Sequence, residues 1–483
     1  MSTAKLSITS LPVWATFNNV KFNDVRVGAI DGKGQGLIAE ADISSLEEEA
    51  SEPRVLVKVP HAVTLCEDVI VAYSKTDKRF YELLELLGPQ STRIKALIFL
   101  LAQKVHSELR IFDSGVSTPW TEYVKYLPDD VFVPTMWHDH ERALLRGTSL
   151  ESAVEAKFTE LTREFDTFQE KSGELPEWAD LWARRTLTLR DWFLADAWYR
   201  SRCLELPRSG DAMVPIIDMA NHSPRPTAIY EESVNYEVTL QLRQGVALAA
   251  GEEVTITYGE GKSAAEILFS YGFIDVEGAK RQLVLPLTPF EDDPLTKAKL
   301  HSFKKAPMVD ISLEDGKISW KSPFAYYMCL NEEDGLEFRV LQDLEGGQQL
   351  KVFWQEDDVT DRVDTFDVLI DGHPLSQIFR LRVVTVIEEL VGSHMGRMES
   401  VTSPEEQELL RSIHGEPRSD CLTMAKTLRD IEFGILEAAL QSLQEQKAVL
   451  IADDSVAAYL GSIEDNQNDQ VPPATSNEEV DFS

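Results

Sequence analysis

The sequence has little cysteine, no long hydrophobic run and far fewer basic than acidic residues. Its four cysteines (Cys66, Cys203, Cys329 and Cys421) form no C-x-x-C pair, which argues against a disulfide framework or a cysteine-rich zinc cluster. No window reaches the roughly 18 consecutive apolar residues of a membrane span, and the first residues lack the basic-then-apolar pattern of a secretory signal. We therefore expect no membrane partner, and a location in the cytoplasm, the nucleus or both.

The charge balance restricts the partners of the chain. Forty-seven Lys and Arg against 82 Asp and Glu give a net charge of -35, which repels phosphate backbones and attracts cations. We predict no nucleic-acid partner and allow a basic protein as substrate. With 483 residues, 43% of them hydrophobic, the chain can bury a large core and divide into two or three domains.

Hydrophobic periodicity divides the chain into strand-rich and helix-rich regions. Short strands with glycine-rich turns are predicted over 22–60, and again over 213–287, where a helix near 263–273 interrupts them. Helices are predicted around 92–105 and from about Ser149 to Phe168, with a packed aromatic connector between them. Further helices are predicted over 422–449 and in a segment that Ser403 would cap, and the acidic last twenty or so residues are predicted to be disordered.

Three short motifs carry the candidate chemistry, and each has an ordinary structural explanation when it is taken alone. Residues 32–36 (GKGQG) suit a hairpin turn better than a ligand-binding loop. Residues 215–223 form an apolar strand that runs into Asn221 and His222, which are common turn formers. Residues 250–259 form a strand that ends in Tyr258, and a strand tyrosine usually packs against its neighbours.

Taken together and in this order, the three motifs and the following YGF at 271–273 resemble the core of SET-domain methyltransferases. WTEYVKYLPDD and RALLRGTSL resemble the helical insert of the Rubisco large-subunit methyltransferase class, and LRDIEFGILEAALQSLQEQK resembles its C-terminal substrate-recruiting domain. The resemblance implies an α+β fold. A SET-domain β-core of short sheets with a pseudoknot and a helical insert would be followed by an all-α C-terminal substrate-binding domain.

The resemblance also implies where the domains divide. The expected parts are an N-terminal arm (1–21), the first part of the SET domain (22–60), a helical insert (61–190), the second part of the SET domain (191–288), a helical substrate-binding domain (289–452) and a disordered acidic tail (462–483).

The activity that the resemblance implies is methyl transfer from S-adenosylmethionine to a lysine of another, non-histone protein. Tyr258 would be the catalytic residue, and Leu204, Asp218 and Tyr271 would line the substrate channel. The residues implied to bind the cofactor are Lys33, Gly34, Gln35, Gly36, Arg202, Asn221, His222 and Phe273. Lys33 departs from the family pattern, because several relatives have glutamate before the glycine. No metal site is expected, since His138 and His140 lack further spaced ligands.

Two alternatives stay open at this point. The related actin-histidine methyltransferases carry a polar amide shortly after the arginine that corresponds to Arg202, whereas Cys203 and the apolar Leu204 follow it here, which favours lysine over histidine. A non-catalytic SET-fold binding protein is the second alternative, motivated by Lys33 and the acidic charge. Ribosomal or translation proteins are the substrates that the resemblance suggests, and the class suggests a monomer. The sequence leaves the number of methyl groups transferred open.

Overall fold

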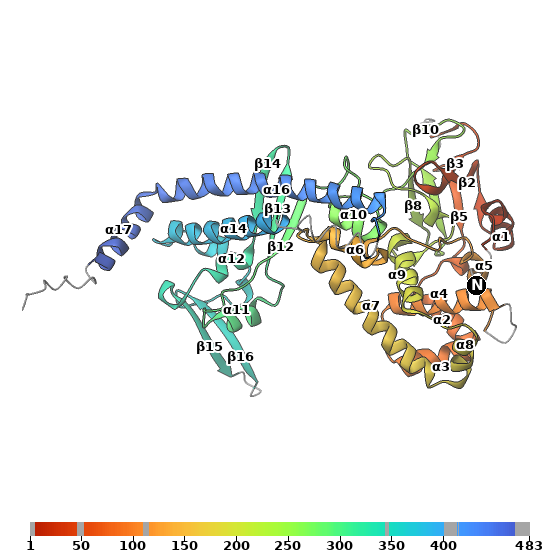
Figure 1. Ribbon diagram of the computed structural model, residues 1–483, viewed down its shortest axis with the longest axis horizontal. Coiled ribbons are helices and arrows are strands. Elements are labelled where there is room, and N and C mark those ends of the chain that lie inside the picture. Colours follow the sequence, from red (N-terminus) through yellow and green to blue (C-terminus); the bar gives the residue numbers. More distant parts are fainter. Residues whose placement is uncertain are drawn as a thin grey trace, which may run out of the picture. The chain divides into compact units, whose positions relative to one another are not determined.

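The computed structural model describes residues 5–45, 53–109, 115–342, 347–399, 413 and 415–468. The chain forms two compact units, each with a hydrophobic core of its own (Figure 1). The first unit comprises residues 1–145, 150–280 and 414–425, and the second comprises residues 146–149, 281–413 and 426–483.

Short antiparallel sheets form one part of the first unit. Their strands are β1 (Lys21–Phe22), β2 (Val25–Ile30), β3 (Gly34–Ala39), β4 (Ile43–Ser44), β5 (Val55–Val59), β6 (Cys203–Leu206), β7 (Gly210–Met213), β8 (Ala228–Glu232), β9 (Val238–Leu242), β10 (Ala247–Leu248) and β11 (Glu253–Val254). The sheet orders are β1-β5-β9-β8, β11-β3-β2, β10-β4 and β6-β7. Strands from residues 21–59 thus pair with strands from residues 228–254, which joins the two predicted halves of the β-core.

The glycine-rich segment is a hairpin turn, as predicted. It connects β2 and β3, and the register pairs Ile30 with Gly34 and Gly28 with Gly36. Gly32 and Gly34 have φ of 69° and 81°, a region that L side chains adopt at a steric cost. The turn therefore needs glycine at these two positions.

Helices form the other part of the first unit. They are α1 (Leu11–Phe17), α2 (Glu67–Thr76), α3 (Lys78–Leu87), α4 (Thr92–Leu109), α5 (Pro119–Tyr123), α6 (Asp139–Arg142), α7 (Leu150–Gly173), α8 (Pro176–Arg184), α9 (Leu189–Arg202) and α10 (Ala264–Tyr271). The predicted helices around 92–105, from Ser149 and near 263–273 are confirmed. Helix α4 is buried almost all round from Ala96 to Val105, so it lies at the centre of the helical insert.

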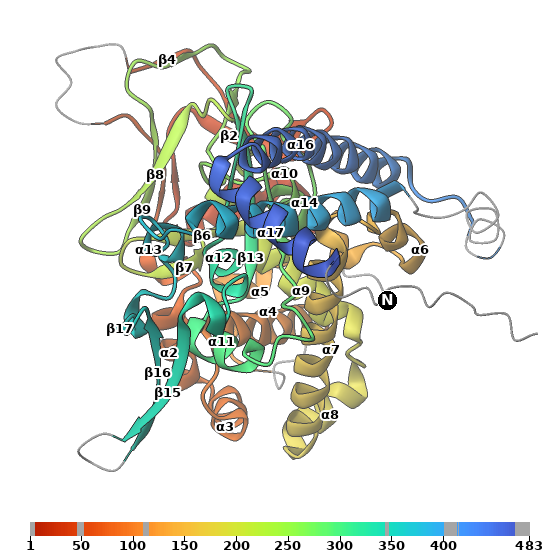
Figure 2. The ribbon, with the colours of Figure 1, turned by 90° about the vertical axis from the view of Figure 1, so that its left-hand side faces the viewer.

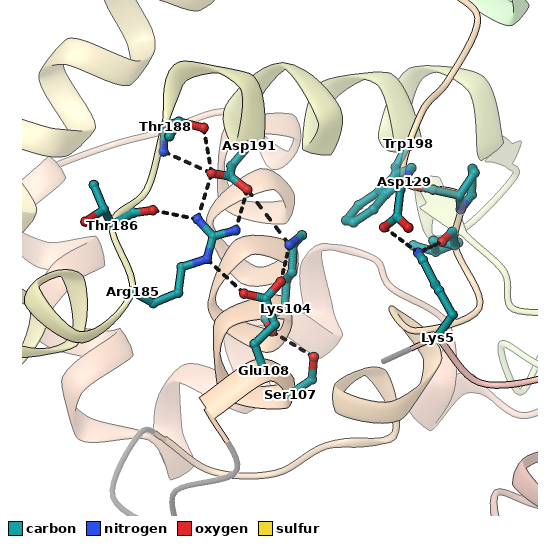
Figure 3. A network of polar contacts seen from close by, with 12 residues as sticks. Lys5, Lys104, Ser107, Glu108, Asp129, Arg185, Thr186, Thr188, Asp191 and Trp198 are labelled. Carbon is teal, nitrogen blue, oxygen red and sulfur yellow. Dashed lines mark hydrogen bonds and ion pairs between the residues drawn. The ribbon is translucent and has the colours of Figure 1, made fainter. Parts of the chain in front are cut away.

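An ion-pair network fastens the end of α8 to α4 and to the start of α9. Arg185 donates from both terminal nitrogens to Asp191 at 2.8 Å and from Nε to Glu108 at 2.8 Å, and Lys104 also binds Glu108 (Figure 3). Glu108 and Asp191 are about nine-tenths buried in their side chains. Since a partly buried carboxylate needs partners, the network holds α4 and the start of α9 in register.

The second unit contains both strands and helices. Its strands are β12 (Gln282–Pro286), β13 (Met308–Glu314), β14 (Lys317–Lys321), β15 (Leu336–Gln342), β16 (Gln348–Trp354) and β17 (Asp357–Asp358), which form two three-stranded antiparallel sheets. Its helices are α11 (Thr296–Phe303), α12 (Pro323–Met328), α13 (Phe366–Leu369), α14 (Ser376–Glu399), most of α16 (Ser419–Ile451) and α17 (Asp454–Asn468). The part of α16 in this unit runs beside α14 (Figures 1 and 2), and the two share one core.

The prediction of an all-α C-terminal domain is therefore wrong, although its long helices are present. In β13 the buried Val309 and Ile311 alternate with half-buried Asp310 and Ser312, which is the two-residue period of a strand. The predicted helix at 422–449 is confirmed within α16.

Two predicted segments fall at or beyond the edge of the described residues. Helix α17 extends to Asn468, so residues 462–468 are helical and not the start of a disordered tail. Residues 469–483 and the helix predicted after Ser403 lie outside the described residues. Within the described part of the chain, no helix is both long and apolar enough to cross a membrane.

Candidate active site

The segment before Asn221 is a buried turn and not the predicted strand. Residues 217–219 form a short 3-10 helix, and Ile216 precedes it with φ 76° and ψ -48°. A positive φ is unfavourable for a β-branched residue, so tertiary contacts must hold this turn in place. The prediction was wrong because a short apolar run suits a buried strand and a buried turn equally well.

Tyr258 joins this turn to the segment after β11. Its hydroxyl donates to the Ala220 carbonyl at 3.0 Å, and its backbone N–H donates to Nδ1 of His222 at 3.1 Å. A parallel bridge between His222 and Ile256 ties the same two segments. The phenol of Tyr258 therefore lies against the residue that precedes Asn221.

Three rings gather around Tyr258. The centroids of Tyr258 and Tyr271 are 4.5 Å apart, those of His222 and Tyr258 are 5.3 Å apart, and those of His222 and Phe273 are 5.8 Å apart. The Tyr271 hydroxyl donates to the Tyr258 carbonyl at 3.0 Å. Gly272 ends α10 with φ 83°, and a Cβ there would lie 2.2 Å from the Phe132 carbonyl oxygen, so the YGF turn requires this glycine.

The hairpin contacts the Asn221 segment from the other side. The Asn221 side-chain amide donates to Oε1 of Glu253 at 2.7 Å and to the Gln35 carbonyl at 3.3 Å. Lys33 pairs with the other oxygen of Glu253 at 2.7 Å. The lysine that stands where several relatives have glutamate is therefore neutralised by a nearby carboxylate. A Cβ on Gly36 would lie 2.6 Å from Cγ1 of Ile30 and 2.8 Å from the Asn221 amide nitrogen, so any larger residue would have to displace these side chains.

Arg202, at the end of α9, binds Asp218 in the turn that precedes Asn221. Its Nη1 lies 3.0 Å from the Asp218 carbonyl oxygen and 3.4 Å from Oδ2, while the hydroxyl of Tyr123 donates to Oδ1 at 2.5 Å. Nε of Arg202 is buried and has no hydrogen-bond partner among the residues that the structure describes. Burial raises the pKa of Asp218, and the charge of Arg202 and the Tyr123 hydroxyl act in the opposite direction.

A cavity of about 300 Å³ opens beside Tyr258. Five of its lining residues were predicted site residues: Arg202, Leu204, Asp218, Tyr258 and Tyr271. Residues 33–36, Asn221, His222 and Phe273 are outside the lining. The structure thus separates the predicted channel residues from most of the predicted cofactor residues, and Tyr258 contacts both groups.

No family model matches the chain. SET domain-containing protein 8 of Schizosaccharomyces pombe is 30% identical over 360 residues, which cover 73% of this chain and 80% of that protein. The chain belongs to the SET-domain family of protein methyltransferases. A chloroplastic fructose-bisphosphate aldolase-lysine N-methyltransferase of Arabidopsis thaliana is 27% identical, and the match spans 56% of this chain and about half (52%) of that enzyme.

The solved structures extend the likeness to the whole fold. A structure of Rubisco LSMT bound to AdoMet matches with a TM-score of 0.68 and 19% identity, covering 96% of this chain and 100% of that one. The family and the SET fold that the sequence predicted are confirmed.

Burial fixes the protonation states in this SET core. It raises the pKa of Tyr258 to about 12, against the smaller opposing effect of Arg202, and that of Tyr271 to about 12. It also raises the pKa of the Cys203 thiol. Both phenols and the thiol are therefore neutral near pH 7, so they serve as hydrogen-bonding and packing groups and not as nucleophiles.

Sequence reasoning missed several residues of the site. Glu253 and Tyr123 are held by contacts with residues far away in the chain, and Glu205, Asp211 and Lys262 line the cavity. Glu253 and Tyr123 had a signal, because they lie within the quoted segments GEEVTITYG and WTEYVKYLPDD. Among the described residues, no group of three or more His, Cys, Asp or Glu is placed to hold a metal ion.

Proposed function

We propose that this protein is an S-adenosylmethionine-dependent methyltransferase that methylates a lysine side chain of another protein. One observation carries the proposal: a neutral Tyr258 hydroxyl, fixed on the Ala220 carbonyl, lies at a cavity of about 300 Å³. The cavity is large enough to admit a lysine side chain, and its wall adjoins the Asn221 segment, which contacts the hairpin, through Tyr258 itself.

The residues beside this cavity fit the cofactor. When bound, S-adenosylmethionine supplies a methyl group on a positively charged sulfur. Three features offer backbone, aromatic and polar contacts to such a molecule. They are the close approach of Gly36 to Asn221, the neighbouring rings of His222 and Phe273, and the buried Nε of Arg202, which has no partner in the described part of the chain. Lys33 is engaged by Glu253, so residues 34–36 are the part of the hairpin that we assign to the cofactor.

Methyl transfer needs a neutral amine aligned with the methyl carbon. A lysine with an ordinary pKa of about 10.4 must give up its proton, which costs roughly 4–5 kcal/mol at neutral pH. The buried Leu204 and the aromatic wall penalise the charged ammonium by desolvation. The Tyr258 hydroxyl then orients the amine in the in-line geometry.

The cavity favours lysine over histidine. Leu204 is 8% exposed and apolar, so it offers no hydrogen bond to an imidazole nitrogen. Glu205 and Asp211 are exposed and face each other across the β6–β7 pair on the cavity lining, so they place negative charge where a basic substrate segment would approach. A basic, non-histone substrate such as a ribosomal or translation protein fits this charge, whereas the monomeric state and the cytoplasmic or nuclear location remain predictions.

The test is methyl transfer from labelled cofactor into an extract of cells that lack this protein, followed by mass spectrometry of the labelled peptide. We expect methyllysine with the wild type and at least 100-fold less methyllysine with Tyr258→Phe, because the variant lacks one hydrogen bond in the transition state. Tyr81→Phe, an exposed tyrosine of α3, is the matched control and should label like the wild type.

Each alternative predicts a different result. A labelled histidine would establish the histidine-directed enzyme. A wild-type protein with no label and no cofactor-induced rise in melting temperature would establish the non-catalytic alternative, because a bound ligand stabilises the folded state.

A further inference from the structure

Tyr123 is a buried tyrosine of the helical insert that reaches the active-site turn. It is the last residue of α5, and its ring lies between Trp14, at a centroid distance of 4.8 Å, and Trp120, at 5.1 Å. The two indole N–H groups donate to the carbonyls of Pro119 at 2.9 Å and Val63 at 3.0 Å. These contacts fix the position of the Tyr123 ring.

The hydroxyl of Tyr123 makes two hydrogen bonds with the same turn. It accepts from the backbone N–H of Ile216 at 2.8 Å and donates to Oδ1 of Asp218 at 2.5 Å. Ile216 has the unfavourable φ of 76°, and such a conformation persists only when its surroundings impose it. A single hydroxyl therefore holds both the strained residue and the carboxylate of the turn.

The turn that Tyr123 holds carries two groups of the proposed chemistry. Its Asp218 binds Arg202, and it ends at Ala220, whose carbonyl accepts from the Tyr258 hydroxyl. We propose that Tyr123 is a positioning residue that places Arg202 and the Tyr258 hydroxyl through Asp218 and the 216–220 turn. This inference rests on the proposed methyltransferase function.

The effect of Tyr123 on the pKa of Asp218 distinguishes a positioning role from a packing role. The polar groups that face its carboxylate are Arg202 on α9, Tyr123 on α5, Tyr258 after β11 and the N–H of Ile216. Burial raises the pKa of Asp218, and the Tyr123 hydroxyl lowers it by donating to the ionised form. Loss of that hydroxyl in Tyr123→Phe raises the pKa of Asp218 further. Asp218 therefore becomes protonated, and its ion pair with Arg202 weakens, at a higher pH in the variant than in the wild type.

The experiment compares kcat and KM of the wild type with those of Tyr123→Phe, Asp218→Asn and the double variant between pH 6 and 9. Tyr126→Phe is the matched control, because Tyr126 is a neighbouring half-buried tyrosine whose hydroxyl bonds only to Ser10 in the described residues, at 2.9 Å. We expect Tyr123→Phe to lower kcat about tenfold, and the double variant to lose less than the product of the two single losses, since both residues act on the same turn. The ratio of Tyr123→Phe to wild-type activity should fall as the pH falls, because acceptor deprotonation cancels in the ratio.

Several outcomes overturn the inference. Losses that add in the double variant, an equal loss in Tyr126→Phe, or an activity ratio that does not change with pH would each show that Tyr123 has only a structural role. Should Tyr123→Phe fail to fold, Asp218→Asn decides: it must lower kcat, and an unchanged kcat overturns the inference, because Tyr123 would then not act through Asp218. An inactive wild type refutes the proposed function itself, whereas an active wild type with unaffected Tyr123→Phe refutes only this inference.

Discussion

Tyr258 is expected to act as a neutral hydrogen-bonding group and not as the base that deprotonates lysine. Its pKa is raised to about 12, so at pH 8 the phenolate lies four pH units away. At about 1.36 kcal/mol per unit, ionising it costs about 5.4 kcal/mol, and roughly one molecule in ten thousand carries the phenolate. The proton of the acceptor amine must therefore leave by solvent equilibrium before transfer.

The perturbation that tests this reasoning is Tyr258→Phe, followed across pH. For the wild type, kcat/KM should rise about tenfold per unit between pH 7 and 9, because the acceptor lysine has an ordinary pKa of about 10.4. The variant should keep this slope and lie about 100- to 1000-fold lower, since it loses one hydrogen bond that orients the amine, worth about 2.7–4 kcal/mol in a transition state.

The assay is initial-rate transfer of labelled methyl to the identified peptide at saturating cofactor, with Tyr81→Phe as the control. Cofactor binding by calorimetry should change less than threefold in Tyr258→Phe, because the hydroxyl bonds to the Ala220 carbonyl. A variant whose rate no longer depends on pH would refute the reasoning, because Tyr258 would then be the titrating group.

Two further predictions concern the hairpin and the second unit. Gly36→Ala should weaken cofactor binding more than about tenfold by calorimetry, because the new methyl would press on both Ile30 and the Asn221 amide, and unchanged affinity would contradict our cofactor assignment. Glu432, which accepts from the Ser149 N–H at 2.9 Å, is 2% exposed, and burial raises its pKa from 4.5 to about 7. Its pKa in the folded state exceeds the unfolded value, so the wild type loses stability as the pH rises. Denaturant unfolding should show that the free energy of unfolding of the wild type falls by about 3 kcal/mol relative to that of Glu432→Gln between pH 4.5 and 8. Parallel plots of this free energy against pH would contradict the prediction.

Local patterns were sufficient for most of the elements. The hairpin glycines, the caps and apolar stripes of α4 and α7, and the glycine that ends α10 each act within a few residues of the chain, so the sequence alone predicts them. The order of the three motifs was also sufficient to predict the SET family. The predicted catalytic residue Tyr258 and the predicted channel residues Leu204, Asp218 and Tyr271 line one cavity. The sheets of the second unit were missed because the prediction followed the family resemblance and not the two-residue period of β13.

The amino-acid sequence by itself determined the fold family, the glycine-rich hairpin and the identity of the tyrosine at the cavity, because each depends on short motifs of neighbouring residues. Only the tertiary structure decided which distant groups complete the site. Tyr123 meets Asp218 across 95 residues, and Glu253 meets Lys33 across 220. Neither pair leaves a local pattern, since a hydrogen bond between distant residues depends on how the intervening helices and sheets pack and not on sequence spacing.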